Sequence, residues 1–384
     1  AGLIEQNAQA ILSENGKEAE ASAKAGLGEA FIDRLALDRK RIAGLAGTLR
    51  KIAGMDVPKE ELAAWKTESG LGIRKVRVPL GVLLLIFESR PDVAVEAVAL
   101  AIKSGNAIIL KGGKEASGTN AAITGLLRQG AREAGLPEGA IQLFAGSRDE
   151  MKELLGMDSC IDLAVTRGGE GLARFVRESA KMPVIEGGRG NCHLYVNEDA
   201  DIEMAARIAI NAKVQKPSAC NAIETMLVHR AIAQTFLPQA ARKLSEAGVE
   251  LRCCPESLAM LEGAGLGAKP ANEEDWATEF SSLVLAVKIV GSGQEAIGHI
   301  NKYGSRHSEA IVAKGRDAAE EFFKGIDAAC VYWNASTRFS DGGQFGFGAE
   351  MCISTQKLHV RGPVGLDGLG TYKYEITGNG NIRG

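Results

Sequence analysis

The sequence lacks a net charge large enough to suggest a polyanionic partner. Its 384 residues carry 45 basic and 48 acidic side chains, which leaves a formal net charge of -3. Such a balance gives no long-range attraction to nucleic acid or to an anionic membrane surface. We therefore expect neither as a partner.

Long apolar runs and targeting signals are also missing. The longest strongly apolar run, Val78–Phe87, is about half as long as a membrane helix requires. The first residues, Ala1–Gln6, show no basic stretch leading into an apolar one, so we expect no secretory signal. The seven cysteines are odd in number and lack CxxC spacing, which favours a reduced, soluble, cytoplasmic protein. The five histidines lack metal-ligand spacing, so we expect no metal site.

Hydrophobic residues make up 45% of the chain, which is enough to bury the cores of two domains. Apolar residues between Phe31 and Ile52 recur at helical intervals, and we expect the first fifty residues to be helical. Short apolar runs then alternate with amphipathic stretches in two series, which is typical of parallel sheets covered by helices on both faces. The expected strands are 82–87, 107–110, 141–144, 161–165 and 184–185, then 193–196, 224–229, 249–252, 283–289, 310–312 and 330–333.

A glycine cluster, Glu186–Gly190, separates the two series, and we place a domain boundary there. The prediction is a cofactor-binding domain from 1–67 and 80–188 and a catalytic domain over 189–360. Two remaining segments, 68–79 and 361–384, contain an edge or hairpin strand near 73–78 and an edge strand near 371–377.

Cys220 is the first candidate for chemistry, because of the residues around it. Pro217 and Ser218 favour the start of a helix, whose dipole together with Lys216 would stabilise a thiolate. Asn221 and nearby backbone amides are candidates to hold an oxyanion. The local sequence leaves open the alternative of a buried structural cysteine.

Two glycine-rich turns follow predicted strands, at Lys111–Lys114 and at Thr166–Gly169. The carboxyl edge of a parallel sheet is where α/β proteins bind nucleotides, and backbone amides of such turns suit a pyrophosphate. No GxGxxG fingerprint follows a strand, and solvated lysines in an ordinary turn remain the alternative.

With Lys111, the Thr166–Gly169 turn and Cys220 in this order, the chain resembles the aldehyde dehydrogenase superfamily, and within it the gamma-glutamyl phosphate reductase family. The matching blocks extend over nearly the whole chain: Pro79–Val82, Glu88–Pro91, Leu110–Glu115, Arg167–Gly169, Gln215–Cys220, Asn334–Gly346 and Ser354–Pro363. The resemblance implies an aldehyde-dehydrogenase-like α/β fold, with parallel-sheet cofactor and catalytic domains plus a small β oligomerisation element.

The implied reaction is the second step of proline synthesis from glutamate. L-glutamyl 5-phosphate would be reduced by NADPH to glutamate 5-semialdehyde, with release of phosphate, through a thioester on Cys220. The resemblance also implies a homo-oligomer of at least two copies and a possible transient contact with the preceding glutamate kinase.

Further roles are carried over from the family pattern. Lys111, Thr166, Arg167, Gly168, Gly169 and Glu279 match cofactor-binding positions. Ser89 falls where relatives place an asparagine that donates to the oxyanion. Arg90, Arg338 and Arg361 are candidates, by charge alone, to hold the substrate's phosphate or α-carboxylate, with structural ion pairing as the alternative.

Two departures from ordinary aldehyde dehydrogenases refine the expected activity. Those enzymes use a glutamate to activate water where this chain has Ile185, and Glu186 would face the other side of its strand. NAD-preferring relatives carry a glutamate where this chain has Lys114, and a cation there favours the 2′-phosphate of NADP. Both features argue against an NAD-linked aldehyde oxidiser, and the Cys220 context argues against a catalytically silent scaffold.

Overall fold

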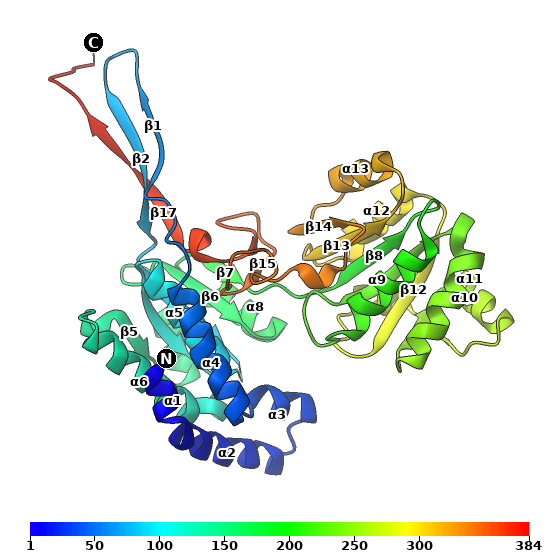
Figure 1. Ribbon diagram of the computed structural model, residues 1–384, viewed down its shortest axis with the longest axis horizontal. Helices are drawn as coiled ribbons and strands as arrows, with labels where there is room; N and C mark the ends of the chain where they lie inside the picture. The colour runs from blue at the N-terminus through cyan, green and yellow to red at the C-terminus, as the bar shows by residue number, and fades with distance from the viewer. Residues whose placement is uncertain (89, 384) are drawn as a thin grey trace. The chain divides into compact units, whose positions relative to one another are not determined.

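The computed structural model describes residues 1–88 and 90–383 in two compact units (Figure 1). One unit comprises residues 1–187, 346–352 and 363–384, and the other comprises residues 188–345 and 353–362. The chain first passes from one to the other between Gly187 and Gly188, inside the glycine cluster. Within the described ranges, no helix combines the length and apolarity needed to cross a bilayer.

The first unit is built around a parallel sheet of five strands in the order β5-β4-β3-β6-β7. Its strands are β3 (Val82–Phe87), β4 (Ala107–Lys111), β5 (Ile141–Leu143), β6 (Leu163–Arg167) and β7 (Val184–Glu186). The central strand β3 is apolar throughout, and its residues 83–87 are buried, as expected of a strand covered on both faces. The predicted parallel α/β sheet is confirmed.

Helices cover both faces of this sheet. The helices are α1 (Gly2–Gln6), α2 (Ala8–Lys24), α3 (Glu29–Leu35), α4 (Arg39–Ala53), α5 (Pro91–Lys103), α6 (Ser117–Glu133), α7 (Arg148–Leu155) and α8 (Glu170–Ser179). The prediction that the first fifty residues are helical is confirmed, but the segment forms four separate helices, α1 to α4. Asp38 starts α4 by accepting a hydrogen bond from the Arg41 backbone N–H, so the periodic apolar face is divided between α3 and α4.

An antiparallel sheet of three strands completes this unit, in the order β1-β2-β17. Its strands are β1 (Glu61–Lys66), β2 (Gly72–Pro79) and β17 (Gly370–Thr377). β2 forms a hairpin with β1 and pairs with β17 on its other side, so the hairpin alternative of its prediction is confirmed and the edge-strand alternative is wrong. β1 was not predicted at all. Its Glu-Leu-Ala-Ala composition favours helix, and pairing with β2 overrides that preference.

The second unit contains a parallel sheet of seven strands in the order β11-β10-β12-β9-β8-β13-β14. Its strands are β8 (Cys192–Val196), β9 (Ile223–His229), β10 (Glu250–Cys253), β11 (Lys269–Pro270), β12 (Val284–Val290), β13 (Ser308–Val312) and β14 (Cys330–Trp333). Apart from β11, which was not predicted, each strand of the two parallel sheets lies within two residues of its predicted range.

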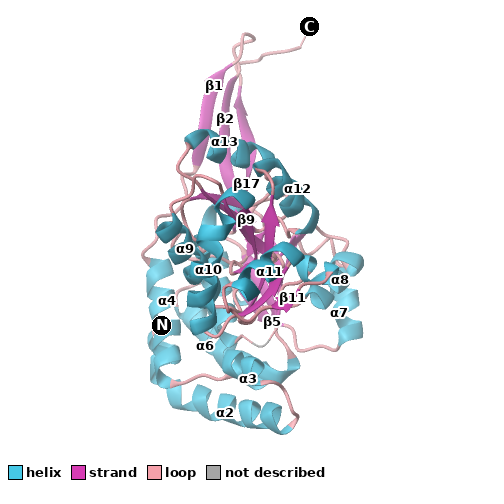
Figure 2. Cartoon of the chain, turned by 90° about the vertical axis from the view of Figure 1, so that its right-hand side faces the viewer, coloured by secondary structure: helices cyan, strands magenta, loops and turns pink. Residues whose placement is uncertain are grey.

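Five helices flank the seven-stranded sheet: α9 (Ile202–Val214), α10 (Arg230–Glu246), α11 (Pro255–Gly263), α12 (Gly293–Tyr303) and α13 (Arg316–Gly325). Figure 2 shows α9, α10 and α11 next to the magenta strands. Residues of α9 and α10 pack with β8, β9 and β12 in the largest core cluster, whereas α12 and α13 contribute to a separate one. Two short strands, β15 (Ile353–Ser354) and β16 (Gly362–Pro363), occur near the end of the chain.

Candidate functional site

Cys220 lies in a partly exposed loop, residues 215–222, between the end of α9 and the start of β9. The Ala219 N–H donates to the Lys216 carbonyl at 3.1 Å and the Ala222 N–H to the Ala219 carbonyl at 2.9 Å, which makes two consecutive turns. The predicted helix start at Pro217 is therefore wrong. Proline and serine begin turns as readily as helices, and β9 starts only two residues after Asn221. A helix dipole does not account for activation of this thiol.

The Cys220 loop lies at the amino edge of the seven-stranded sheet. β8, β9 and β12 are parallel neighbours, so the segments that precede them meet at one edge. Gly190, before β8, packs so closely that a Cβ atom would lie 1.6 Å from the Cys220 carbonyl oxygen. Glu279, before β12, accepts a hydrogen bond from the Gly190 N–H at 3.0 Å. The structure thus brings the predicted nucleophile and the predicted cofactor-binding carboxylate to adjacent segments.

The side chain of Asn221 holds a neighbouring loop. Its Nδ2 donates to the backbone carbonyl oxygens of Ser340 at 2.8 Å and Arg338 at 3.3 Å, and the backbone carbonyl of Asn221 accepts from the Thr337 hydroxyl at 2.6 Å. Both amide hydrogens are thereby engaged within the protein. The Asn221 side-chain amide is thus less suited to donate to an oxyanion, and the backbone amides of the Cys220 loop remain the other predicted candidates.

The same interactions place Arg338 near the Cys220 loop. Its Nε donates to the Gln215 side-chain oxygen at 2.8 Å, so this direct partner is neutral. Burial lowers the pKa of the Arg338 guanidinium, while the negative charges of a Cys220 thiolate and of Asp341 oppose that shift. A partly desolvated cation beside the candidate nucleophile is suited to bind an anionic group.

Arg361 has a different environment. Its Nη1 donates to the Asp327 carboxylate at 2.8 Å, and hydrogen bonds from Arg361 and Lys357 lower the pKa of Asp327. This ion pair matches the structural alternative for Arg361. Arg90, the third candidate, precedes α5 and occupies its N-cap position. The other oxyanion candidate, Ser89, falls outside the described residues.

A second cysteine lies directly behind the candidate nucleophile. The Cys192 thiol is buried and donates to the Cys220 carbonyl oxygen at 3.2 Å. Burial, followed by the charge of Glu309, raises the pKa of Cys192 well above its ordinary value. Because the thiolate is the nucleophilic form, Cys192 is poorly suited to react, in contrast to the partly exposed Cys220.

In the first unit, the candidate cofactor residues lie at the carboxyl edge of the five-stranded sheet. Lys111 ends β4 and pairs with Ile86, and Arg167 ends β6 and pairs with Phe87, so both flank the end of β3. The chain order reverses between β3 and β6, which makes this the topological switch point where open α/β sheets bind ligands. Lys114 is exposed just beyond β4. This placement of both turns agrees with a nucleotide site.

Sequence reasoning missed the role of Glu88, which follows β3. Its carboxylate accepts a hydrogen bond from the Gly169 N–H at 3.0 Å, and its own N–H donates to the Arg167 carbonyl at 3.0 Å. A Cβ atom on Gly168 would lie 2.7 Å from the Glu88 carboxyl carbon. The backbone amide predicted to meet a pyrophosphate is therefore already bound by an anion. The Arg167 side chain donates to the Met351 carbonyl at 3.0 Å.

The strand β7 shows the predicted arrangement of Ile185 and Glu186. Ile185 is 1% exposed and belongs to the core. Glu186 forms an ion pair with Arg177 at 2.8 Å, so its carboxylate is directed to α8. Neither side chain offers a carboxylate for activating water at this position.

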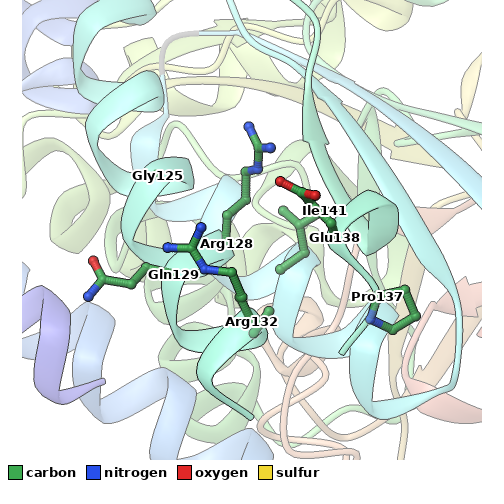
Figure 3. A pocket seen from close by; sticks show the side chains of 8 residues that line it. Gly125, Arg128, Gln129, Arg132, Pro137, Glu138 and Ile141 are labelled. Carbon is green, nitrogen blue, oxygen red and sulfur yellow. The ribbon is translucent and has the colours of Figure 1, made fainter. Parts of the chain in front are cut away.

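A separate cavity of about 230 Å³ lies beside the second half of α6 (Figure 3). Arg128, Arg132 and Glu138 line it, together with Ile141 at the start of β5. Because β5 begins there, the cavity is at the amino edge of the sheet, away from Lys111 and Arg167. It does not belong to the candidate cofactor site. Across the described part of the chain, no cluster of three or more His, Cys, Asp or Glu residues is arranged to hold a metal ion.

Comparisons with known proteins agree with this arrangement. Residues 6–253 match the aldehyde dehydrogenase family. A gamma-glutamyl phosphate reductase from Carboxydothermus hydrogenoformans is 51% identical, with 100% of this chain and 92% of the relative aligned. The namesake from Moorella thermoacetica is 49% identical, over 100% of this chain and 91% of the relative.

Solved structures give the same result. The crystal structure of gamma-glutamyl phosphate reductase from Thermotoga maritima superimposes with a TM-score of 0.95 at 42% identity, covering 100% of this chain and 92% of that one. An acetylating aldehyde dehydrogenase from Geobacillus thermoglucosidasius reaches a TM-score of 0.70 at 19% identity, covering 100% of this chain and 92% of that one, and shows the shared fold alone.

Proposed function

The chain belongs to the gamma-glutamyl phosphate reductases of the aldehyde dehydrogenase family, and we propose that it performs their reaction through a thioester on Cys220. It is an oxidoreductase of proline biosynthesis that reduces L-glutamyl 5-phosphate to L-glutamate 5-semialdehyde. The observation that supports the residue assignment is the loop 215–222, which presents a partly exposed Cys220 next to Glu279 and Arg338.

The proposed chemistry begins with the Cys220 thiolate. The sulfur attacks the acyl carbon of glutamyl 5-phosphate, the C–O bond to the phosphate breaks, and phosphate leaves with its electron pair. The resulting thioester stays on Cys220. Backbone amides of the loop stabilise the oxyanion that forms on the acyl oxygen before phosphate leaves and again when hydride adds to the thioester. When bound, NADPH supplies the hydride that this reduction needs. The thiohemiacetal then collapses to the aldehyde and returns the thiolate.

The residues present fit an NADPH cofactor. Lys111 and the exposed Lys114 offer two ammonium groups at the switch point, in keeping with the preference of the 2′-phosphate for cations. Thr166 has a buried hydroxyl without a hydrogen-bond partner in the described structure, which a ligand group at this edge can satisfy. Gly168 and Gly169 provide the tight turn, and Glu279 is the carboxylate proposed for the nicotinamide ribose.

The buried Ile185 supports reduction over hydrolysis. An aldehyde dehydrogenase that produces acid needs a base to activate water against the thioester. Here the corresponding side chain is apolar, and the neighbouring Glu186 is bound to Arg177. The lack of such a base at this position favours transfer of hydride to the acyl group on Cys220 over its hydrolysis.

The assay that tests this function runs the reaction backwards. Purified protein incubated with glutamate semialdehyde and NADP is expected to form NADPH only when inorganic phosphate is added, because phosphate must release the acyl group. NADPH formation without phosphate would instead indicate oxidation of the aldehyde to the acid, and would contradict the proposal.

Arg338 is the arginine we propose for substrate binding. Arg338→Gln should raise the KM for glutamate semialdehyde and phosphate by about 10- to 100-fold, because a charge-assisted hydrogen bond is worth about 1.5 to 3 kcal/mol. Steady-state kinetics of the reverse reaction measure this. Arg316→Gln, at an exposed ion pair on α13, is the matched control and should leave KM unchanged. Equal KM values for Arg338→Gln and the control would contradict the role.

Glu88 should weaken cofactor binding, because its carboxylate occupies the amide proposed for the pyrophosphate. Glu88→Gln keeps a hydrogen-bond acceptor for Gly169 but removes the charge. We expect NADPH to bind about two- to fivefold more tightly, since a charge at a helix N-terminus is worth about 0.3 to 1 kcal/mol. Fluorescence titration of NADPH measures the Kd. Glu170→Gln, on the first residue of α8, is the control, and an equal gain there would rule out a specific role for Glu88.

We also propose that the chain forms a homo-oligomer through the sheet β1-β2-β17. Its edge strands β1 and β17 carry exposed apolar side chains, namely Leu62, Trp65, Tyr372, Tyr374 and Ile376. Such a concentration of exposed apolar groups on an edge strand is typical of an association surface. Cytoplasmic location and a transient contact with glutamate kinase remain expectations from the family.

A further inference from the structure

A buried ion pair lies at the base of the Cys220 loop. Lys213, in the last turn of α9, and Glu224, the second residue of β9, are both 0% exposed, and the Lys213 ammonium donates to the Glu224 Oε2. The loop 215–222 connects the two elements. The pair therefore fastens the two ends of the loop that carries the nucleophile.

The other Glu224 oxygen extends the connection to the segment that carries Glu279. Oε1 accepts a hydrogen bond from the Ser281 N–H at 3.1 Å. Ser281 has a φ of 52°, an unusual backbone conformation for a residue with a side chain. Two residues earlier, Glu279 binds the Gly190 N–H at 3.0 Å, and Gly190 packs against the Cys220 carbonyl. These contacts form a continuous network that joins the segments before β8, β9 and β12 at this edge of the sheet.

The charged side chains of this network, Lys213 and Glu224, are buried next to an apolar core. Lys213 and Glu224 lie beside the largest core cluster of the unit, which contains their neighbours Ala212 and Ile223. Burying two charges has a large desolvation cost, and an apolar pair of the same volume is often neutral or better for stability. A polar pair, in contrast, fixes both distance and direction between the elements it joins.

The electrostatics of the pair agree with strong desolvation. Burial lowers the pKa of Lys213 and raises that of Glu224 to about 7, and the attraction between the two opposes both shifts. The other titratable groups that act on the pair are Glu279 and Cys192. The net charge of the pair is zero whether the proton lies on nitrogen or on oxygen, so the intact pair places no net charge beside the Cys220 loop.

We propose that Lys213 and Glu224 are positioning residues that hold the Cys220 loop and the Glu279 segment in the relative geometry that the reaction needs. This inference rests on the proposed function, because it assigns Cys220 as nucleophile and Glu279 as cofactor ligand. Neither Lys213 nor Glu224 is required to touch substrate or cofactor.

The test uses Glu224→Gln, Lys213→Met and the combined variant in the full chain. Glu224→Gln keeps the acceptor for Ser281 and removes the charge, and the combined variant contains no unpaired buried charge. We expect kcat to fall about 10- to 100-fold in all three, with KM for glutamate semialdehyde and NADP within about threefold of wild type. In the combined variant, which leaves the net charge of the site unchanged, alkylation of Cys220 by iodoacetamide, measured across pH, should slow by a similar factor without a change in the apparent pKa of the thiol.

Glu309→Gln is the matched control, because Glu309 is 1% exposed and its Oε2 lies 3.0 Å from His193 Nδ1 elsewhere in the same sheet. It should lower the thermal midpoint but leave kcat within about twofold. The combined variant decides between roles: recovery of the thermal midpoint with kcat still low supports positioning. Recovery of wild-type kcat and alkylation rate in the combined variant would show that the pair only supports folding, and would overturn the proposal.

Failure of this inference is distinguishable from failure of the proposed function. If the wild-type protein shows no phosphate-dependent reduction of NADP, the function itself is wrong. If wild type is active and the combined variant is equally active, only the positioning role is wrong. If the single variants do not fold, the combined variant still gives the answer, because its buried charges are removed together.

Discussion

Replacing Cys220 with serine is expected to abolish phosphate-dependent reduction of NADP by glutamate semialdehyde. Serine keeps the size of the side chain, but its hydroxyl is far less nucleophilic than a thiolate at neutral pH. We expect kcat/KM to fall by at least about four orders of magnitude, or about 5.5 kcal/mol of transition-state stabilisation. NADPH binding, measured by fluorescence titration, and the thermal midpoint should stay near their wild-type values, since Cys220 is only partly buried.

Two controls separate this effect from a general loss of thiols. Cys160 is exposed and lies outside both parts of the candidate site, so Cys160→Ser should keep wild-type kinetics. When iodoacetamide inactivates the wild-type protein, the modified residues should include Cys220 but not the buried Cys192. Substantial activity in Cys220→Ser would show that another group is the nucleophile, and the central assignment would be lost.

The second large effect concerns cofactor choice. Lys114→Glu is expected to lower the ratio of kcat/KM for NADPH over NADH by about 100-fold, corresponding to about 2.7 kcal/mol. The exposed ammonium of Lys114 attracts the extra 2′-phosphate, whereas a carboxylate repels it and accepts hydrogen bonds from the ribose hydroxyls of NAD. The kcat/KM for each cofactor is measured for wild type and for Lys114→Glu, with glutamyl phosphate in the forward reaction or with the semialdehyde in the reverse reaction. The change in cofactor preference follows from the two ratios.

Lys114→Gln is the matched variant, because it removes the positive charge without adding a negative one. Its ratio should lie between those of wild type and Lys114→Glu. Higher ionic strength should reduce the difference, since exposed charges are screened by salt. An unchanged ratio in both variants would place the 2′-phosphate near another cation, with Lys111 as the first alternative.

Most of the secondary structure could be predicted because apolar patterning reports burial directly. β3 is six apolar residues in a row, as expected of a parallel strand that is covered on both faces. The prediction failed at β1, where the exposed Glu-Leu-Ala-Ala-Trp-Lys stretch has no buried face. A strand of that kind exists only because β2 offers hydrogen bonds, and the sequence contains no local trace of that pairing.

For the site, residue types were predictable and their partners were not. Glu88 and Gly169 are far apart in sequence, yet one hydrogen bond joins them and changes how the glycine turn is expected to bind a cofactor. Arg338 and Arg361 looked equivalent by charge. The structure separates them, because one is bound by the neutral Gln215 and the other by Asp327.

Cys220 illustrates the same division most clearly. The sequence by itself determined the family, and it supplied the proposal that Cys220 is the nucleophile and the apolar Ile185 in place of a hydrolytic base, because these depend on which residues follow one another along the chain. The tertiary structure alone decided that Cys220 lies in a double turn and not at a helix start, and that Lys213 and Glu224 hold the ends of its loop. Proline and serine suit a turn as well as a helix start, so the local sequence does not distinguish the two. The pairing of β9 in its sheet and the buried pair at the ends of the loop are contacts that exist only in the folded chain.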